Sequence, residues 1–175
     1  MPSSIASIVF ISASLLISST PLATSSSALI DKVCASGKLI SVATCRKALE
    51  SEPRVASAKD LYELSIETIK SGITKSSATL DHIKTLLKDN GADPALGKCK
   101  GSYEWVIVSL NSALGEVGMK EYLTATYDLL LVGSVCIRNC EEVVASKAIK
   151  DEIIVQGNQL VKVFGSSAYA AVNLL

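Results

Sequence analysis

Apolar side chains recur at alternating steps of three and four residues between positions 96 and 117 of the chain. This spacing places them along one face of an α-helix and is typical of the seam of a packed helical bundle. Asp93 and Pro94 suit the start of that helix, because aspartate accepts hydrogen bonds from free backbone N–H groups and proline is tolerated in the first turn. The predicted seam consists of Leu96, Cys99, Tyr103, Val106, Leu110, Ala113 and Val117.

The same kind of repeat predicts a longer helix before this one. It runs from about Ala58, near the capping residues Ser57 and Asp60, to the pair Asn90 and Gly91, where glycine favours the left-handed backbone that ends many helices. With a rise of about 1.5 Å per residue, this helix is roughly 50 Å long. Its predicted seam is Tyr62, Ile66, Ile69, Ile73, Ser76, Leu80, Ile83 and Leu87.

Two further helices are predicted after a tight turn at Gly118. The first runs from about Met119 to Ala145 and carries two adjacent apolar rows, so we expect neighbours to cover most of it. The second follows a connection at residues 146–152. The two rows are Tyr122, Ala125, Leu129, Val132, Cys136, Asn139, Val143 and Met119, Leu123, Thr126, Leu130, Gly133, Ile137, Cys140, Val144, and the last helix shows Ile153, Leu160, Val163, Ser167, Ala170 and Leu174.

These patterns together predict an all-α fold. Four long helices with short connections favour an up-down-up-down four-helix bundle over residues 57–175. Residues 28–52 predict two short helices with a break at Gly37, and each helix carries one cysteine on its apolar side. A disulfide between Cys34 and Cys45 would contribute about 2–3 kcal/mol, mainly by constraining the unfolded chain. We therefore expect a short N-terminal helical hairpin in front of the bundle.

Residues 1–27 contain no charged side chain. An apolar stretch from Ser4 to Ser18 is followed by small residues, which is the layout of a secretory signal peptide. The apolar stretch is short for a membrane-spanning helix of about 20 residues. We therefore expect cleavage between Ala23 and Ala28 and export of a single domain, residues 28–175.

Charge gives no sign of a nucleic-acid or lipid partner, because 17 basic and 17 acidic residues balance without forming a basic stripe. All five cysteines lie in the predicted mature part, and export favours disulfides. Cys99 lies on a seam and can therefore pair with a cysteine of a neighbouring helix. Cys136 and Cys140, one helical turn apart, are both candidates, and an odd number of cysteines leaves one thiol over.

Catalytic and metal-binding motifs are scarce. His82 is the only histidine, and the chain has no Glu-x-x-His pair, no nucleophile elbow and no glycine-rich phosphate loop. We therefore expect no catalytic residue, no cofactor and no bound metal. An exported helical bundle of this kind is expected to act by binding another molecule rather than as an enzyme.

Several short motifs occur in order along the chain. They are Leu29-Ile30-Asp31-Lys32-Val33-Cys34, the stretch from Cys45 to Arg54, Ala95-Leu96-Gly97-Lys98-Cys99 with Tyr103, Cys140-Glu141-Glu142, Asn158-Gln159-Leu160, and the ending from Ala171 to Leu175. Through these motifs and their spacing, essentially the whole chain resembles the plant invertase and pectin methylesterase inhibitor family. The fold of that family is a four-helix bundle with an N-terminal helical hairpin.

The resemblance implies a secreted inhibitor that blocks pectin methylesterase or, alternatively, acid invertase in a 1:1 protein complex. It implies the apoplast or cell wall as the location, or the vacuole if the target is vacuolar invertase. The family pattern pairs its first cysteine with the second and its third with the fourth. Carried over, this gives Cys34–Cys45 and Cys99–Cys140, and it leaves Cys136 as the free thiol.

Invertase-directed family members often carry a Pro-Lys-Phe tripeptide near the turn between the second and third bundle helices. The corresponding turn here has a lysine but no such tripeptide, which favours pectin methylesterase as the target. Two other possibilities stay open, namely a structural or signalling bundle without inhibitory activity and a covalent dimer through Cys136. The turn that we expect to bind the partner consists of Gly118, Met119, Lys120, Glu121 and Tyr122.

Overall fold

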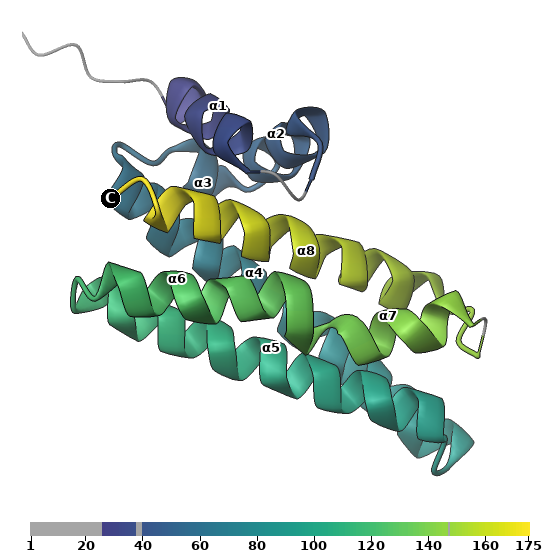
Figure 1. Cartoon of the computed structure of the whole chain (residues 1–175). Coiled ribbons are helices and arrows are strands. Elements are labelled where there is room, and N and C mark those ends of the chain that lie inside the picture. The colour runs from purple at the N-terminus through teal and green to yellow at the C-terminus, as the bar shows by residue number, and fades with distance from the viewer. Residues whose placement is uncertain (1–25, 38–39, 147) are drawn as a thin grey trace, which may run out of the picture.

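The computed structural model describes residues 26–37, 40–146 and 148–175, so most of the predicted signal peptide lies outside the described residues. Within these ranges the chain is helical and contains no strand, which confirms the predicted all-α fold. Figure 1 labels the elements, which are α1 (Ser26–Ser36), α2 (Val42–Glu50), α3 (Pro53–Ala56), α4 (Leu61–Asn90), α5 (Pro94–Gly118), α6 (Tyr122–Leu131), the π-helical segment η1 (Val132–Cys136), α7 (Arg138–Ala145) and α8 (Glu152–Val172).

Four long rods form the bundle in up-down-up-down order. The first rod, α4, packs against both α5 and α8. The third rod is built from α6, η1 and α7 end to end, and it packs against α5 on one side and α8 on the other. Figure 1 shows α1 and α2 outside this bundle, against α8. The predicted bundle with a preceding hairpin is therefore confirmed.

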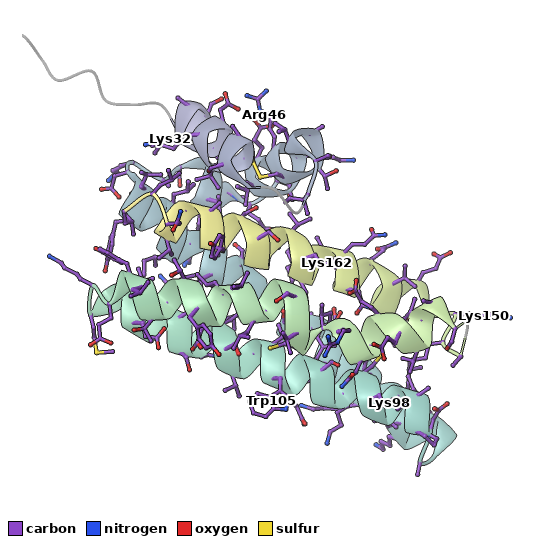
Figure 2. The ribbon with its side chains drawn as sticks, in the orientation of Figure 1. Lys32, Arg46, Lys98, Trp105, Lys150 and Lys162 are labelled. Carbon is purple, nitrogen blue, oxygen red and sulfur yellow. A yellow bond between two sulfur atoms is a disulfide. The ribbon has the colours of Figure 1, made fainter. Side chains whose placement is uncertain are left out.

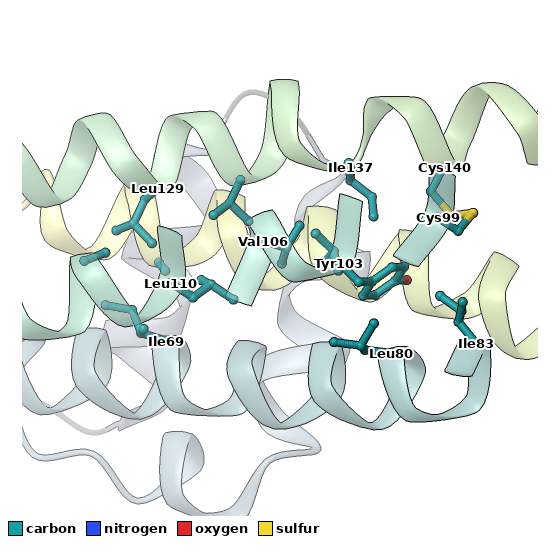
Figure 3. Packing of buried hydrophobic residues seen from close by; sticks show 14 of the residues in the cluster. Ile69, Leu80, Ile83, Cys99, Tyr103, Val106, Leu110, Leu129, Ile137 and Cys140 are labelled. Carbon is teal, nitrogen blue, oxygen red and sulfur yellow. A yellow bond between two sulfur atoms is a disulfide. The ribbon is translucent and has the colours of Figure 1, made fainter. Parts of the chain in front are cut away.

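The α5 seam lies at the centre of the larger hydrophobic core, as Figure 3 shows. All residues of the seam predicted for this helix are buried. Tyr103 is completely buried, and its hydroxyl donates a hydrogen bond of 3.0 Å to Oδ1 of Asn158 on α8. Burial raises the pKa of Tyr103, which keeps the phenol neutral and able to donate. This polar contact fixes how α5 and α8 face each other across the bundle.

The first long helix, α4, begins at Leu61, three residues later than the predicted start at about Ala58, because Asp60 is its N-cap. Oδ1 of Asp60 accepts a hydrogen bond of 2.8 Å from the backbone N–H of Glu63. The side chain of Glu63 in turn accepts one of 2.9 Å from the backbone N–H of Lys59. The first bond makes Asp60 the N-cap, and the second resembles a capping box except that its donor, Lys59, lies one residue before the N-cap. At the other end, Gly91 has a φ of 75°, as predicted for the residue that stops the helix.

The seam predicted for α4 is wrong at its first position. Tyr62 is exposed, whereas Leu64 is fully buried. Leu64 belongs to a second, smaller core, together with Val55 of α3 and Leu49 of α2. The first turns of α4 therefore face the hairpin side and not the bundle seam. Sequence analysis did not predict α3, whose short turn lies between the hairpin and the bundle.

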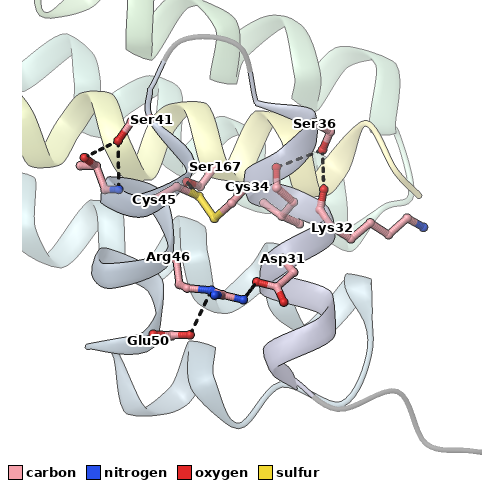
Figure 4. The surroundings of a disulfide bond; sticks show 11 residues. Asp31, Lys32, Cys34, Ser36, Ser41, Cys45, Arg46, Glu50 and Ser167 are labelled. Atoms are coloured by element: carbon pink, nitrogen blue, oxygen red, sulfur yellow. Dashed lines mark hydrogen bonds and ion pairs between the residues drawn. A yellow bond between two sulfur atoms is a disulfide. The ribbon is translucent and has the colours of Figure 1, made fainter.

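The hairpin is held by a disulfide between Cys34 and Cys45, the pairing expected from the sequence. Figure 4 shows this disulfide between α1 and α2, with Sγ of Cys45 3.4 Å from Oγ of Ser167 on α8. Arg46 forms ion pairs with Asp31 across the hairpin and with Glu50 one turn further along α2. The hairpin also shares the second core with Phe164 and Ala171 of α8, both of which are buried. It is therefore packed into the domain rather than merely appended to it.

The start of α8 is tied to α4 by a short polar network. Asp151 caps α8 by accepting a hydrogen bond of 3.0 Å from the backbone N–H of Ile154, and its carboxylate lies 2.9 Å from Nε2 of His82. Burial acts to raise the pKa of Asp151, but the hydrogen bonds from His82 and Ile154 outweigh it and lower the pKa. The only histidine thus has a structural partner. Ile153, which was predicted to face inward, is exposed, and Ile154 is buried instead.

The third rod is interrupted, whereas the sequence predicts one continuous helix from Met119 to Ala145. Lys120 has a φ of 63°, so α6 begins only at Tyr122. The π-helical segment η1 then inserts one extra residue into the rod. At η1 the inward-facing positions consequently change from the first predicted row to the second. The buried series reads Ala125, Leu129, Val132, Ile137, Cys140 and Val143, and the last of these lies on the first row again.

The η1 segment packs closely against glycine on α8. A Cβ placed on Gly165 would lie 2.8 Å from Cγ1 of Val132 and 3.5 Å from the backbone nitrogen of Gly133. Val132 is fully buried and, being β-branched, has little rotamer freedom. Only a residue without a side chain lets the two rods approach this closely.

Replacement of Gly165 by alanine is therefore expected to destabilise the fold by about 1–3 kcal/mol, because overpacking a tight contact forces neighbours to move. The free energy of unfolding from urea titration measures this change. Gly115→Ala is the control, because a Cβ there meets no atom within 4 Å and alanine favours the helix by up to about 1 kcal/mol. Equal stability of the Gly165 variant and the wild type would contradict the close packing.

Candidate functional site

A groove of about 690 Å³ runs between α5 and the third rod. Trp105 and several small residues are among the α5 side chains that line it, and side chains of α6, η1 and α7 form the opposite wall. The α5 residues include Lys98, Gly101, Ser102, Trp105, Val108 and Ser109, and the opposite wall includes Asp128, Leu131, Val135, Cys136 and Asn139.

Large apolar side chains are unusually exposed on the same two rods. Trp105 is 66% exposed and Val108 56%, and both border the groove from α5. On α6, Leu123 is 87% exposed, and Tyr127 and Leu130 follow it at helical spacing. We call Leu123, Tyr127 and Leu130 the α6 outer face. Clustered exposed apolar groups of this kind mark sites where proteins bind other molecules.

The turn predicted to bind a partner leads directly into the α6 outer face. Gly118 is the last residue of α5, and the next three residues are exposed, with Met119 at 64%. Lys120 takes the left-handed conformation, with a φ of 63°. Tyr122 differs from the other turn residues, because it packs against the bundle core as the first residue of α6. The turn therefore presents Met119, Lys120 and Glu121 beside Leu123.

Three carboxylates gather near this turn. Burial, followed by the negative charges of Asp128 and Glu121, raises the pKa of Glu116. Oε2 of Glu116 is buried and has no hydrogen-bond partner among the residues that the structure describes. The ionised form of Glu116 is thus disfavoured in the folded protein, which makes this end of the bundle sensitive to acidity.

The second disulfide joins Cys99 of α5 to Cys140 of α7, the pairing implied by the family resemblance. Cys136 is free and half-buried in the groove, with its Sγ 3.7 Å from Oγ of Ser109. Burial raises the pKa of Cys136, which disfavours the reactive thiolate. The extra residue in η1 explains both outcomes, since it turns Cys140 toward the core and Cys136 toward the groove.

Metal-binding clusters do not form in the described part of the chain. No group of three or more His, Cys, Asp or Glu residues is placed to hold a metal ion there. In the same ranges, no helix combines the length and the apolar character that crossing a bilayer requires.

Comparison with known protein families identifies the chain. Residues 28–169 match the family model described as plant invertase/pectin methylesterase inhibitor. The chain belongs to this family. The match starts within α1 and ends within α8, so it includes the hairpin, the bundle and both disulfides. None of the curated proteins compared with this family member matches it.

Two solved inhibitor structures share the fold. A mutant form of a pectin methylesterase inhibitor from Arabidopsis, form A, is 19% identical, with a TM-score of 0.72, and the match covers 83% of this chain and 96% of that chain. A pectin methylesterase inhibitor from Arabidopsis thaliana is 20% identical, with a TM-score of 0.57, and the match covers 83% and 95%. At these identities the likeness shows the fold alone.

The apolar pattern of this inhibitor-family chain does not predict the groove. Its signal was Trp105, a large aromatic residue that lies off the α5 seam between Tyr103 and Val106. A residue at that position must point away from the core, and an exposed tryptophan on a long helix is unusual enough to indicate a binding surface. The opposite wall gave no such signal, because it depends on η1.

Replacement of Glu116 by glutamine should raise the thermal unfolding midpoint at about pH 7 and leave it unchanged in acid below the ordinary glutamate pKa of about 4.5. The raised pKa means that the folded state binds more protons than the unfolded state between the two pKa values. Stability therefore falls as the pH rises through the folded pKa, and glutamine removes that loss. Glu142→Gln, at an exposed position, is the control. If Glu116→Gln raised the unfolding midpoint by the same amount in acid, the charge of Glu116 would not be the cause.

Proposed function

We propose that this protein is a secreted inhibitor that binds pectin methylesterase in the plant cell wall and blocks its active-site cleft. Membership of the plant invertase/pectin methylesterase inhibitor family supports an inhibitory role. The observation that carries the proposal for this chain is the α6 outer face together with the exposed turn before it. An exposed apolar row lowers solubility unless a partner covers it. Because the family consists of enzyme inhibitors, we take that partner to be a protein.

The surface is presented rigidly, which favours tight binding. The Cys99–Cys140 disulfide ties α5 to α7 at one end of the two rods. At the other end, the backbone N–H of Glu121 donates a hydrogen bond of 2.8 Å to the carbonyl of Glu116 and closes the turn. A helix face that is ordered before binding loses less conformational entropy in the complex. The proposed complex contains one inhibitor and one enzyme molecule.

Export completes the proposal. Residues 1–27 would act as a signal peptide, with residues 28–175 left as the inhibitor domain in the apoplast. The two disulfides support this location, because disulfides persist in oxidising compartments outside the cytosol. The mature inhibitor would perform no catalysis of its own.

Acid invertase is the alternative target, and the turn offers the way to distinguish the two. Lys120 is exposed and carries the only positive charge in the turn Gly118–Tyr122. Lys120→Gly removes that charge while suiting the left-handed backbone at φ 63°, so the turn keeps its shape. If the variant still inhibits pectin demethylation but no longer slows sucrose hydrolysis, both enzymes are targets and Lys120 is required for binding to invertase.

Introduction of a carboxylate into the α6 outer face should abolish most of the inhibition. Leu123→Asp is expected to weaken inhibition of pectin methylesterase by at least about 30-fold, because a hot-spot residue contributes about 2 kcal/mol or more to binding. The inhibition constant is measured in a pectin demethylation assay with purified enzyme. The fold should tolerate the change, since Leu123 is almost fully exposed.

Ile153→Asp is the matched control, because Ile153 is an exposed apolar residue at the start of α8, outside the proposed surface. It should inhibit like the wild type. Equal loss in both variants would mean that the substitution acts through stability. Full inhibition by Leu123→Asp would move the binding surface elsewhere, and no inhibition of either enzyme by the wild type would reject the proposed function.

A further inference from the structure

The groove between α5 and the third rod holds a polar group that the fold itself does not satisfy. Ser102 is 3% exposed and lines the groove, and its Oγ has no hydrogen-bond partner among the described residues. A buried hydroxyl without a partner is costly, and native proteins rarely keep one without a reason. Because this oxygen is almost inaccessible to solvent, a ligand in the groove supplies the missing partner only when the neighbouring side chains shift.

The same end of the groove is kept open by glycine. Gly97 and Gly101 lie inside α5, where glycine weakens a helix relative to alanine. A Cβ on either residue would meet no atom within 4 Å, so close packing does not require glycine at these positions. The two glycines therefore leave free space along the helix between Lys98 and Trp105.

Trp105 provides a broad apolar wall next to this space. Its side chain is 66% exposed and lines the groove, and it is the only tryptophan in the chain. Asn139 lines the groove from α7 and adds amide hydrogen-bonding groups. An aromatic face combined with hydroxyl and amide groups suits a ligand that has both an apolar face and a polar rim.

The charge at this end is positive. Lys98 lines the groove, lies along α5 with Trp105 (Figure 2), and forms no ion pair with any described residue. The nearby acids are neutralised, because Glu104 pairs with Lys100 at 3.3 Å and Glu141 pairs with Lys162 at 2.6 Å.

The one acidic side chain of the groove belongs to its other end. Asp128 is close enough to Glu116 to raise the pKa of Glu116. Glu116 lies roughly 27 Å along α5 from Lys98 at about 1.5 Å per residue. That separation is well beyond the screening length of about 8 Å at physiological ionic strength. An anionic group next to Lys98 is therefore attracted and not repelled.

We propose that this end of the groove binds a carboxylated sugar, namely a uronic acid unit of an acidic oligosaccharide. A pyranose ring has an apolar C–H face, which would stack on the indole of Trp105. Its carboxylate would pair with Lys98, and its hydroxyl groups would exchange hydrogen bonds with Asn139 and, after a shift of the groove wall, with Ser102. The site is distinct from the α6 outer face, and sugar binding requires no enzyme.

The test uses the inhibitor alone and the fluorescence of Trp105. Titration with trigalacturonic acid should change the emission saturably, and the change should weaken as salt rises, because the Lys98 contact is electrostatic. The neutral trisaccharide maltotriose should bind at least tenfold more weakly. As a second measurement, trigalacturonic acid should slow the reaction of Cys136, the one free cysteine of the described chain, with a thiol reagent.

Variants assign the contacts. Lys98→Gln and Gly101→Ala should each weaken trigalacturonic acid binding at least tenfold. The first removes the positive charge, and the second places a methyl group in the space that the glycine leaves free. Gly101→Ala also tests folding, because its unfolding midpoint should match or exceed that of the wild type. Lys32→Gln is the control, because Lys32 is an exposed residue of α1 that does not line the groove, and it should bind like the wild type.

Three results would overturn the proposal, namely no saturable emission change with trigalacturonic acid, equal binding of maltotriose, or unchanged binding by Lys98→Gln. Because the assay contains no enzyme, these results leave the inhibition of pectin methylesterase untouched. Conversely, an inhibitor that fails against both enzymes but binds trigalacturonic acid would reject only the inhibitory function.

Discussion

The single extra residue in η1 decides which side chains of the third rod reach the core. In an uninterrupted α-helix, the row that begins at Ala125 and Leu129 would continue inward to Cys136. With the π-helical segment, Ile137 and Cys140 occupy the inward positions instead. The disulfide to Cys99, the groove wall and the placement of the free thiol all follow from this register. The tight contact between Val132 and Gly165 holds the segment in place against α8.

The sequence predicts the fold well where periodicity and local chemistry agree. The α5 seam is buried throughout, and Asp93 caps α5 as expected. Of the two residues expected to cap α4, Ser57 and Asp60, only Asp60 does so. Prediction was less accurate where a helix serves two cores. The first turns of α4 face the hairpin side, so Tyr62 is exposed and Leu64 is buried, and a single seam could not anticipate that division.

The candidate site was only partly predictable for a related reason. The turn before α6 could be located because Gly118 interrupts two long patterns, although Lys120 adopts the left-handed conformation. The groove could not be derived, since its far wall depends on η1, and a π-helical turn has no distinct sequence signal at this length. The two apolar rows in the third rod were the sign of η1 in the sequence pattern. Two rows on one continuous helix predict a wide buried face, whereas in the structure the second row replaces the first at η1.

The register change at η1 also has a consequence for how chain length relates to shape in this rod. Removal of one residue from the segment would convert it to ordinary α-helix and bring Ile137 to the fourth position after Val132, which still faces the core. The inner surface would therefore survive the deletion with the same side chains in contact. Only the outward bulge would vanish, and with it the placement of Val135 and Cys136 along the groove. The segment behaves as an insertion that reshapes one external face and is neutral to the interior.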